Sequence, residues 1–182
     1  MEASKFRLAR SDFLNRGLDV LAADGPRSLT AARMARELLV TTGSFYWHFS
    51  TVDDFRDELK RFWRDDIVIG IINDVREQAK DPGNVLDEIG RIIRQRGTHR
   101  YDAAMRSWAK SDRGAEEIVR SADALRGDLI ARVLRDAGAS EEQARDKSNL
   151  LGAAWLGSQD MEDPEYRFKL MGMITRDSDS NS

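Results

Sequence analysis

The chain has 182 residues, of which 41% are hydrophobic and 34% are charged, and its formal net charge is −3. This length is sufficient to bury a hydrophobic core in one domain or in two closely packed domains. Cysteine is absent, which excludes disulfides, thiol catalysis and thiolate metal sites and fits a reducing cytoplasm. No run approaches the roughly 20 apolar residues that span a bilayer, and the N-terminus lacks the pattern of a signal peptide, so no membrane partner is expected.

The first predicted helix begins between Arg7 and Ser11 and ends at Ala23. Its apolar residues recur at helical spacing, and an Asp-Gly-Pro run directly after it stops the helix. Lys5 and Arg10 lie near its start, where they can reach phosphates or remain as solvated surface charges.

Residues 29–49, LTAARMARELLVTTGSFYWHF, predict two short helices joined by a tight turn. Thr30 can cap the first helix and Thr41 the second, because a threonine hydroxyl accepts a hydrogen bond from a backbone N–H of the first turn. An apolar residue precedes each cap and another follows it within the helix, at the spacing of a hydrophobic staple. A helix-turn-helix places its second helix in the major groove of DNA. The second helix here begins with the small residues 42–44, so DNA binding is the first functional hypothesis.

Six further helices follow this unit. Capping residues, turn signals and apolar residues at helical spacing place them at residues 53–79, 85–96, 100–110, 115–137, 141–159 and 163–175. Among these signals, Ser140 and Gln143 form a capping box, and Gly138 is placed to end the preceding helix. No β-strand and no internal repeat are predicted. The predicted fold class is therefore all-α, with about nine helices.

The distribution of charge is compatible with DNA binding at one end of the chain. Residues 1–50 contain seven lysines and arginines against five acidic residues, whereas the whole chain is negative. We place a functional boundary in the long helix near Arg64. This predicts a three-helix helix-turn-helix DNA-binding domain over residues 1–64, a helical ligand-binding and dimerisation domain over residues 65–175, and a disordered polar tail over residues 176–182.

The run VTTGSFYWHF at residues 40–49, preceded by MAREL at residues 34–38 and by a Gly25…Leu29-Thr30 lead-in, resembles the TetR family of transcriptional regulators. The resemblance covers the family's DNA-binding domain over about residues 7–60, and the remainder matches only in the number and lengths of its helices. It implies a cytoplasmic homodimer that binds a palindromic double-stranded DNA operator, usually as a repressor. It also implies that a small molecule entering the C-terminal domain releases the protein from DNA.

Carried over by position, the family's DNA contacts fall on eight residues: Thr30, Thr41, Thr42, Gly43, Ser44, Tyr46, Trp47 and His48. Thr41 is better placed for capping, whereas Thr42 is freer to face DNA. Tyr46 and Trp47 are interpreted as reaching the sugar-phosphate wall, since the neighbouring phenylalanines already supply an apolar face. No second histidine or cysteine lies near His48, so no metal site is expected there.

Two residues depart from the family pattern. The family usually has glycine in the turn where this chain has Leu39, and a lysine near the start of the fourth helix where this chain has Val52. If the turn needs a positive φ, Leu39 strains it by about 1 kcal/mol. Without the lysine, one phosphate contact is lost, and we expect DNA binding that is weaker and less sensitive to salt.

Aromatic and polar side chains of the C-terminal part are candidates for a ligand pocket: Phe62, Trp63, His99, Tyr101, Met105, Trp108, Asn149 and Trp155. Each aromatic can instead be ordinary core, and packing inside one chain is also the alternative for the predicted dimer interface. That interface comprises small and apolar residues of the last two helices, which can form a four-helix bundle with their symmetry mates: Gly152, Trp155, Leu156, Phe168 and Met171. The predominance of aliphatic and aromatic residues favours an apolar or aromatic ligand, and no cofactor is expected.

The favoured interpretation is a ligand-responsive transcriptional regulator that is not an enzyme. The alternatives are a helical enzyme or small-molecule-binding protein that no longer reads DNA, and a regulator that binds other proteins. Against an enzyme, the sequence has no nucleophile–base pair, and paired carboxylates such as Asp53-Asp54 are adjacent, which directs them to different faces of a helix. The sequence does not determine the effector, the operator, or whether binding represses or activates.

Overall fold

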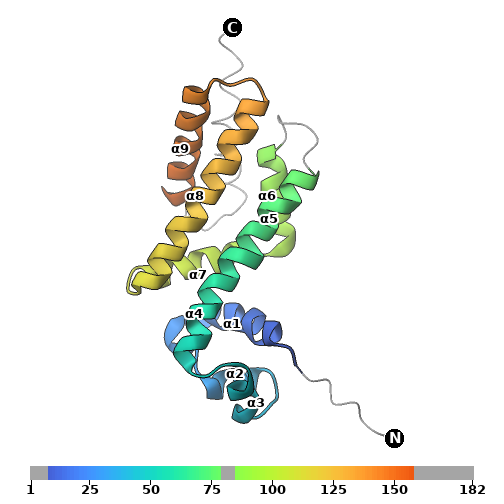
Figure 1. The fold of residues 1–182 in the computed structure, drawn as a ribbon, viewed down its shortest axis with the longest axis vertical. Coiled ribbons are helices and arrows are strands. Elements are labelled where there is room, and N and C mark those ends of the chain that lie inside the picture. The colour runs from blue at the N-terminus through green and yellow to red at the C-terminus, as the bar shows by residue number, and fades with distance from the viewer. Residues whose placement is uncertain (1–7, 79–84, 158–182) are drawn as a thin grey trace, which may run out of the picture. The chain divides into compact units, whose positions relative to one another are not determined.

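The computed structural model describes residues 8–78 and 85–157 (Figure 1). Every regular element in these two ranges is a helix and none is a strand, which confirms the all-α prediction. The predicted turn at 81–84, the last helix at 163–175 and the tail at 176–182 lie outside the described residues. The described residues pack into two compact units.

The first unit comprises the described parts of residues 1–66 and 100–119. Its elements are α1 (Arg10–Asp24), the 3₁₀ turn η1 (Pro26–Ser28), α2 (Ala31–Glu37), α3 (Thr42–His48), α4 (Val52–Phe62), α7 (His99–Ala109) and the start of α8 (Arg113–Asp136).

An aromatic cluster forms the core of the helix-turn-helix part of this unit. Phe13 of α1, Phe45 of α3 and Phe55 of α4 are fully buried, and the rings of Phe45 and Phe55 meet edge to face with centroids 5.3 Å apart. Gly17 allows α1 to approach α4 closely, because a Cβ atom there would lie only 2.7 Å from the Phe55 ring. The three helices are therefore fixed by contacts between side chains far apart in the sequence.

The predicted helix caps are confirmed. Thr30 accepts a hydrogen bond of 3.2 Å from the Arg33 N–H at the start of α2, and Thr41 accepts one of 3.3 Å from the Ser44 N–H at the start of α3. Thr51 caps α4 in the same way. Each hydroxyl satisfies a backbone donor that has no partner within the helix.

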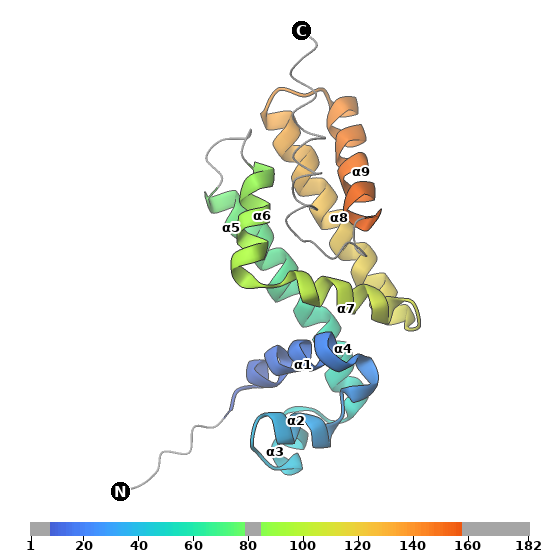
Figure 2. The same ribbon diagram turned by 180° about the vertical axis from the view of Figure 1, so that it is seen from behind.

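The second unit comprises the described parts of residues 67–99 and 120–182, in which α5 (Ile69–Gln78), α6 (Val85–Arg96), the rest of α8 and α9 (Glu141–Gly157) lie. In both views α5 runs beside α6 and α8 runs beside α9 (Figure 2). Ser148 of α9 donates a 2.9 Å hydrogen bond to the Gly127 carbonyl of α8. The predicted capping box of α9 is present, with Ser140 and Gln143 each accepting from the backbone N–H of the other.

The long helix predicted at residues 53–79 is not one regular α-helix. Between α4 and α5 the chain forms a π-helical segment, η2 (Trp63–Val68), and it leaves the first unit there. The first unit also takes in residues 100–119, which follow the predicted boundary at residues 64 and 65 in the chain but pack with the N-terminal helices. The functional roles of the two predicted domains stay predictions.

Candidate nucleic-acid interface and candidate ligand cavity

The turn between α2 and α3 is tight. The Val40 N–H donates to the Ala35 carbonyl at 2.9 Å, and the Leu39 N–H donates to the Arg36 carbonyl at 3.3 Å. Leu39 has φ of +55° and is the only non-glycine residue with a positive φ in the part of the chain that the structure describes. The turn therefore requires the left-handed conformation for which glycine is suited, and this chain adopts it with a leucine that is 92% exposed.

The two faces of α3 differ in burial. Phe45 faces the core and is fully buried, whereas Tyr46 is 53% exposed and Trp47 is 64% exposed. Thr42 and Gly43, at the start of the helix, are also exposed. The interpretation that Tyr46 and Trp47 lie outside the core is confirmed. The exposed face thus combines small residues at the helix N-terminus with two large aromatic side chains.

The hydroxyls around the start of α3 are not equivalent. Thr41 Oγ1 accepts from the Ser44 N–H and also lies 3.3 Å from Ser44 Oγ, so both hydroxyls are engaged within the helix cap. Among the described residues, no hydrogen-bond partner of the Thr42 hydroxyl is found. Thr30 is occupied in capping α2. Of the three predicted threonine contacts, Thr42 has the hydroxyl most available to an external partner.

Gly43 has no steric reason to be a glycine in the protein by itself. A Cβ atom added there would meet only Thr41 Oγ1, at an ordinary contact distance of 3.5 Å. Glycine in a helix costs about 0.5–1 kcal/mol relative to alanine. The absence of a side chain leaves room for close approach of another molecule to the start of α3.

His48 is held within the first unit. Its Nε2 atom lies 3.1 Å from the Leu8 carbonyl, to which it can donate, and its ring packs 5.1 Å from that of Phe13 and 4.7 Å from that of Trp47. These contacts attach the residues before α1 to the end of α3. They give His48 a structural role, and its predicted DNA contact stays a prediction.

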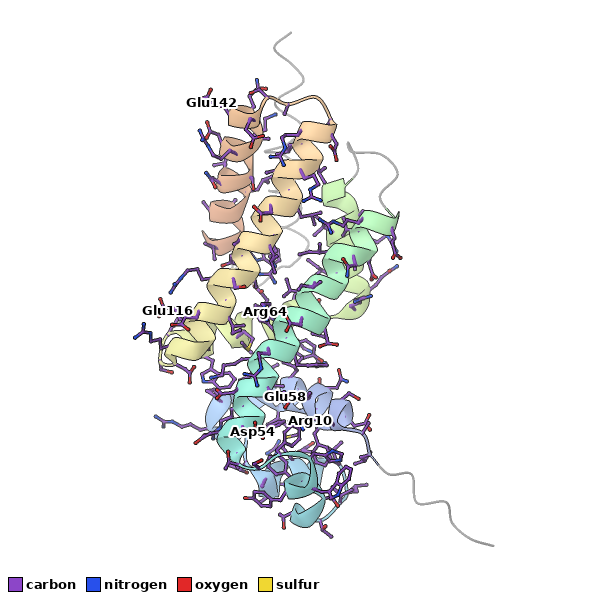
Figure 3. The ribbon with its side chains drawn as sticks, viewed as in Figure 1. Arg10, Asp54, Glu58, Arg64, Glu116 and Glu142 are labelled. Atoms are coloured by element: carbon purple, nitrogen blue, oxygen red, sulfur yellow. The ribbon has the colours of Figure 1, made fainter. Side chains whose placement is uncertain are left out.

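Many cations of the first unit are already paired. Arg10 of α1 forms an ion pair with Glu58 of α4, and the two side chains lie together in Figure 3. Arg33 pairs with both Asp24 and Glu37. In contrast, Arg27 and Arg36 are exposed, and neither has an ion pair among the described residues. The surface around α2 and α3 therefore offers few uncommitted positive charges.

Val52 is the first residue of α4, and the first turn of that helix is acidic through Asp53 and Asp54. This is the position at which the TetR resemblance leads one to expect a lysine. The local charge is therefore negative where a phosphate contact is usual, which supports the expected weak salt dependence.

The second unit contains a cavity of about 400 Å³. Its wall is largely aliphatic, with one aromatic side chain and four polar or charged ones, and comprises Val68, Ile71, Ile72, Ile89, Ile93, Asp123, Arg126, Gly127, Leu129, Ile130, Ser148, Asn149, Leu151, Gly152, Ala153, Trp155 and Leu156. A cavity of this size and character is typical of sites for small apolar molecules.

Two of the eight predicted pocket residues, Asn149 and Trp155, line this cavity. The other six do not: Phe62, Trp63, His99, Tyr101, Met105 and Trp108. Trp63, Met105 and Trp108 are buried in the first unit. The isoleucines of α5 and α6 that line the cavity were not predicted, although their helical spacing already indicated a buried face. Asp123 and Arg126 were not predicted either, because they resemble ordinary surface charges in the sequence.

Tyr101 joins α7 to α1 instead. Its hydroxyl donates a 2.7 Å hydrogen bond to Asp19 Oδ1, which also accepts from Arg100 at 2.7 Å. Burial and the Asp19 carboxylate together raise the pKa of the Tyr101 hydroxyl. The residue therefore remains a neutral donor at physiological pH and contributes to the packing of the first unit.

A buried lysine lies in the same unit. Lys60 of α4 is 6% exposed, and its Nζ atom lies 2.8 Å from Asp57 and 3.1 Å from Asp112. It also lies 5.0 Å from the centroid of the Trp108 ring. Burial by itself would lower the pKa of Lys60, but the two carboxylates outweigh this effect and raise it. Lys60 was not recognised from the sequence, because Asp112 and Trp108 are far along the chain.

The predicted dimer residues Gly152, Trp155 and Leu156 lie on α9, and the other two, Phe168 and Met171, lie outside the described residues. Leu156 is 50% exposed, and the Cβ position of Gly152 meets no atom within 4 Å. These three α9 residues also line the cavity. Their part in a dimer stays a prediction.

Among the described residues, no group of three or more histidines, aspartates and glutamates is arranged to hold a metal ion. None of the helices described is long and apolar enough to cross a membrane.

No protein-family model and no curated protein matches the chain. Solved structures, however, match it over almost its whole length. A transcriptional regulator from Rhodococcus sp. Rha1 is 21% identical with a TM-score of 0.71, covering 93% of this chain and 95% of that one. A TetR transcriptional regulator from Legionella pneumophila is 13% identical with a TM-score of 0.72, covering 97% of each chain.

The TetR-family transcriptional repressor FadR from Thermus thermophilus, solved in complex with lauroyl-CoA, is 18% identical with a TM-score of 0.56, covering 92% of this chain and 93% of that one. Identities this low carry information about the fold rather than about the site. The helix order and the helix-turn-helix agree with the fold expected from the sequence resemblance. The chain has the fold of the TetR-family transcriptional regulators.

Proposed function

We propose that this protein is a dimeric, ligand-responsive transcriptional regulator that binds a palindromic DNA operator through α2 and α3, most simply as a repressor. The observation that carries the proposal is the exposed face of α3. Thr42 and Gly43 are open at the helix N-terminus, and Tyr46 and Trp47 are exposed beside a fully buried Phe45. Large aromatic side chains that are more than half exposed on one helix face are typical of an interaction surface, and DNA contains a groove floor and a sugar-phosphate wall that they can contact.

Roles within this surface follow from the contacts of each residue. Thr42 is the candidate for a base or phosphate contact, and Gly43 permits close approach of the DNA backbone. Tyr46 and Trp47 are proposed to pack against the sugar-phosphate wall. Thr30 and Thr41 cap the two helices, and Ser44 donates its N–H to the Thr41 hydroxyl. In the complex with DNA, the three hydroxyls are proposed to contribute through the hydrogen-bonding capacity that these contacts leave. His48 supports α3 from the side of α1.

The cavity of the second unit is the proposed effector site. Its apolar wall suits a small apolar or aromatic molecule, and a regulator of the same fold, FadR from Thermus thermophilus, was solved with lauroyl-CoA. Binding there releases DNA only if the effector has higher affinity for the state that does not bind DNA, because a ligand with equal affinity for both states shifts nothing. Two recognition helices of a dimer would contact half-sites about 34–36 Å apart, one helical turn of DNA.

A gel-shift assay with the intergenic DNA upstream of the protein's own gene tests the proposal. We expect the wild type to bind this DNA selectively over unrelated DNA, with affinity that falls as salt is raised. Thr42→Ala/Trp47→Ala should lose at least tenfold in affinity, because it removes a hydroxyl contact and an aromatic contact. Asn15→Ala, on the exposed side of α1, serves as the matched control and should bind as the wild type does.

Thermal melts of all three proteins establish that the variants are folded. If the wild type shows no selective, salt-sensitive binding, or if the folded double variant binds as tightly as the wild type, the regulator proposal is wrong. In that case a helical small-molecule-binding protein that no longer reads DNA becomes the better interpretation.

A further inference from the structure

We propose that Leu39 is a specificity-determining residue of the DNA-binding surface, and that its side chain contacts the C5-methyl group of a thymine in the major groove. This inference rests on the proposed DNA-binding function and names a base that the protein reads. It is carried by the exposure of the leucine, its place beside the other candidate contacts, and the charge of the surface around it.

The Leu39 side chain is available to a partner. It is 92% exposed, more than any other large hydrophobic side chain in the described ranges. Two backbone hydrogen bonds hold the turn: the Leu39 N–H donates to the Arg36 carbonyl at 3.3 Å, and the Val40 N–H donates to the Ala35 carbonyl at 2.9 Å. The φ of +55° at Leu39 is a conformation that costs a leucine free energy. An unfavourable conformation that keeps an apolar side chain in water points to a role in binding.

Leu39 lies beside the residues that are proposed to contact DNA. Residues 41–43 are exposed, and so are Tyr46 and Trp47 of α3. Since Leu39 precedes Thr42 by three positions, the Cα atoms of these two residues are at most about 11 Å apart. That distance corresponds to about three base pairs of DNA, which are spaced by about 3.4 Å. The leucine therefore extends the same exposed surface and can reach the same half-site.

The charge of this surface favours contacts with bases over contacts with phosphates. Arg10 and Arg33 are both held in ion pairs with carboxylates of the same unit. The first turn of α4 is acidic. Phosphate contacts position a protein on DNA but do not read its sequence directly. A surface with few uncommitted cations depends more on its contacts with base edges, and Leu39 is its most exposed apolar group.

Thymine is the base that suits this side chain. Leucine has neither a donor nor an acceptor in its side chain, and the apolar group that base pairs present in the major groove is the C5-methyl of thymine. Beside the amino group of cytosine or adenine, the leucine would displace water without replacing its hydrogen bond. Glycine, which the TetR family usually has at this position, has no side chain that could make the contact. The preference for thymine is therefore expected of this chain in particular.

Replacement of thymine by deoxyuridine tests the contact, because it removes the C5-methyl and leaves the hydrogen-bonding groups of the base unchanged. Footprinting of the intergenic DNA upstream of the protein's own gene locates the operator, and each thymine position is then replaced in both half-sites. At one position, the affinity of the wild type should fall about fivefold or more, since burial of a single methyl group is worth about fourfold. Deoxyuridine outside the footprint is the control and should have no effect.

Three variants assign the methyl contact to Leu39. Leu39→Asn accepts a positive φ and has a polar side chain of similar size, so it should bind the thymine and deoxyuridine operators within about twofold of each other. Leu39→Met is the matched control, because it keeps an apolar side chain, and it should keep a preference for thymine of about threefold or more. The dependence of affinity on salt should be the same in the wild type and both variants, because no phosphate contact is changed. Leu39→Gly also accepts the positive φ and replaces Leu39→Asn if thermal melts show that Leu39→Asn is unfolded.

The outcomes separate this inference from the proposed function. A wild type that does not bind the intergenic DNA selectively contradicts both. If the wild type binds selectively but no thymine replacement weakens it, the inference is wrong and the regulator proposal stands. The same conclusion holds if Leu39→Asn keeps the wild-type preference for thymine, because another residue then reads the methyl group.

Discussion

Leu39 has a backbone conformation that costs free energy, and its side chain makes no buried contacts that offset this cost. Its φ of +55° lies in the left-handed region, which costs a residue other than glycine roughly 1–2 kcal/mol. Its side chain is 92% exposed, so burial contributes nothing in return. The substitution of leucine for the family's usual glycine is therefore a local strain in the turn of the helix-turn-helix.

Leu39→Gly is expected to raise the free energy of unfolding by about 0.5–1 kcal/mol. Relief of the left-handed strain exceeds the greater entropy that glycine adds to the unfolded chain, about 0.4–1 kcal/mol. Urea denaturation measures the difference. As a control, Ala32→Gly at an exposed position of regular helix in α2 should lower the same free energy by about 0.5–1 kcal/mol. If both variants are destabilised alike, the turn is not strained.

At the scale of elements, α4 is joined to the start of α8 within the first unit. Lys60 Nζ lies 3.1 Å from Asp112 Oδ1 across 52 positions of sequence, and the same oxygen accepts a 2.7 Å hydrogen bond from the Ala115 N–H in the first turn of α8. Burial by itself would raise the pKa of Asp112, but the Ala115 N–H and the Lys60 ammonium outweigh burial and lower it. One carboxylate thus caps a helix and pairs a buried cation.

A lowered pKa in the folded state means that the ionised Asp112 stabilises the fold at pH values above its ordinary pKa of 3.8, and that this contribution is lost as the pH falls through the folded-state value. Asp112→Asn keeps a good N-cap but removes the charge. We expect it to lower the free energy of unfolding by about 1–2 kcal/mol at pH 7. Below about pH 4, the free energy of unfolding of the variant should fall less steeply with decreasing pH than that of the wild type.

Urea denaturation at a series of pH values measures this dependence. Asp66→Asn removes an exposed carboxylate that has no ion pair among the described residues. It should leave the decrease of the free energy of unfolding at low pH unchanged. The role assigned to the Lys60–Asp112 pair would be contradicted if Asp112→Asn had wild-type stability at pH 7 and lost stability at low pH as the wild type does.

At the scale of the whole molecule, α9 has apolar surface left for a partner. Leu150 is 54% exposed and Leu156 is 50% exposed, and the Cβ position of Gly152 is open. Exposed apolar side chains beside small residues are typical of helix faces that pack closely against another helix. This supports the proposal that α9 contributes to a homodimer, which a palindromic operator requires.

We expect the wild type to sediment as a dimer at micromolar concentration in analytical ultracentrifugation. Leu156→Arg should shift it toward the monomer by at least tenfold in dissociation constant, because an unpaired charge would be buried at an apolar interface. Gln143→Arg, at an exposed polar position on the same helix, introduces the same side chain and should not change the equilibrium. A monomeric wild type would contradict the dimer proposal.

The features that the sequence predicted correctly have local physical causes. Thr30 and Thr41 cap helices because a hydroxyl and a backbone N–H three residues later are neighbours along the chain. Phe45 is buried and Trp47 is exposed because helical periodicity directs them to different sides. The left-handed conformation at Leu39 agrees with an expectation drawn from the family resemblance, since the family usually has glycine at that position. The family resemblance added the helix order, and the fold agrees with it.

What only the tertiary structure decided depends on contacts between distant residues. Periodicity marks Trp63, Met105 and Ile93 alike as apolar, but it does not tell which neighbour each will meet, so the first two were assigned to a pocket that Ile93 in fact lines. The Lys60–Asp112 pair likewise required the packed helices, because its two residues lie 52 positions apart in the sequence. The order of the residues determines local hydrogen bonding and the amphipathicity of each helix. The lining of a cavity depends instead on which helix faces pack against one another.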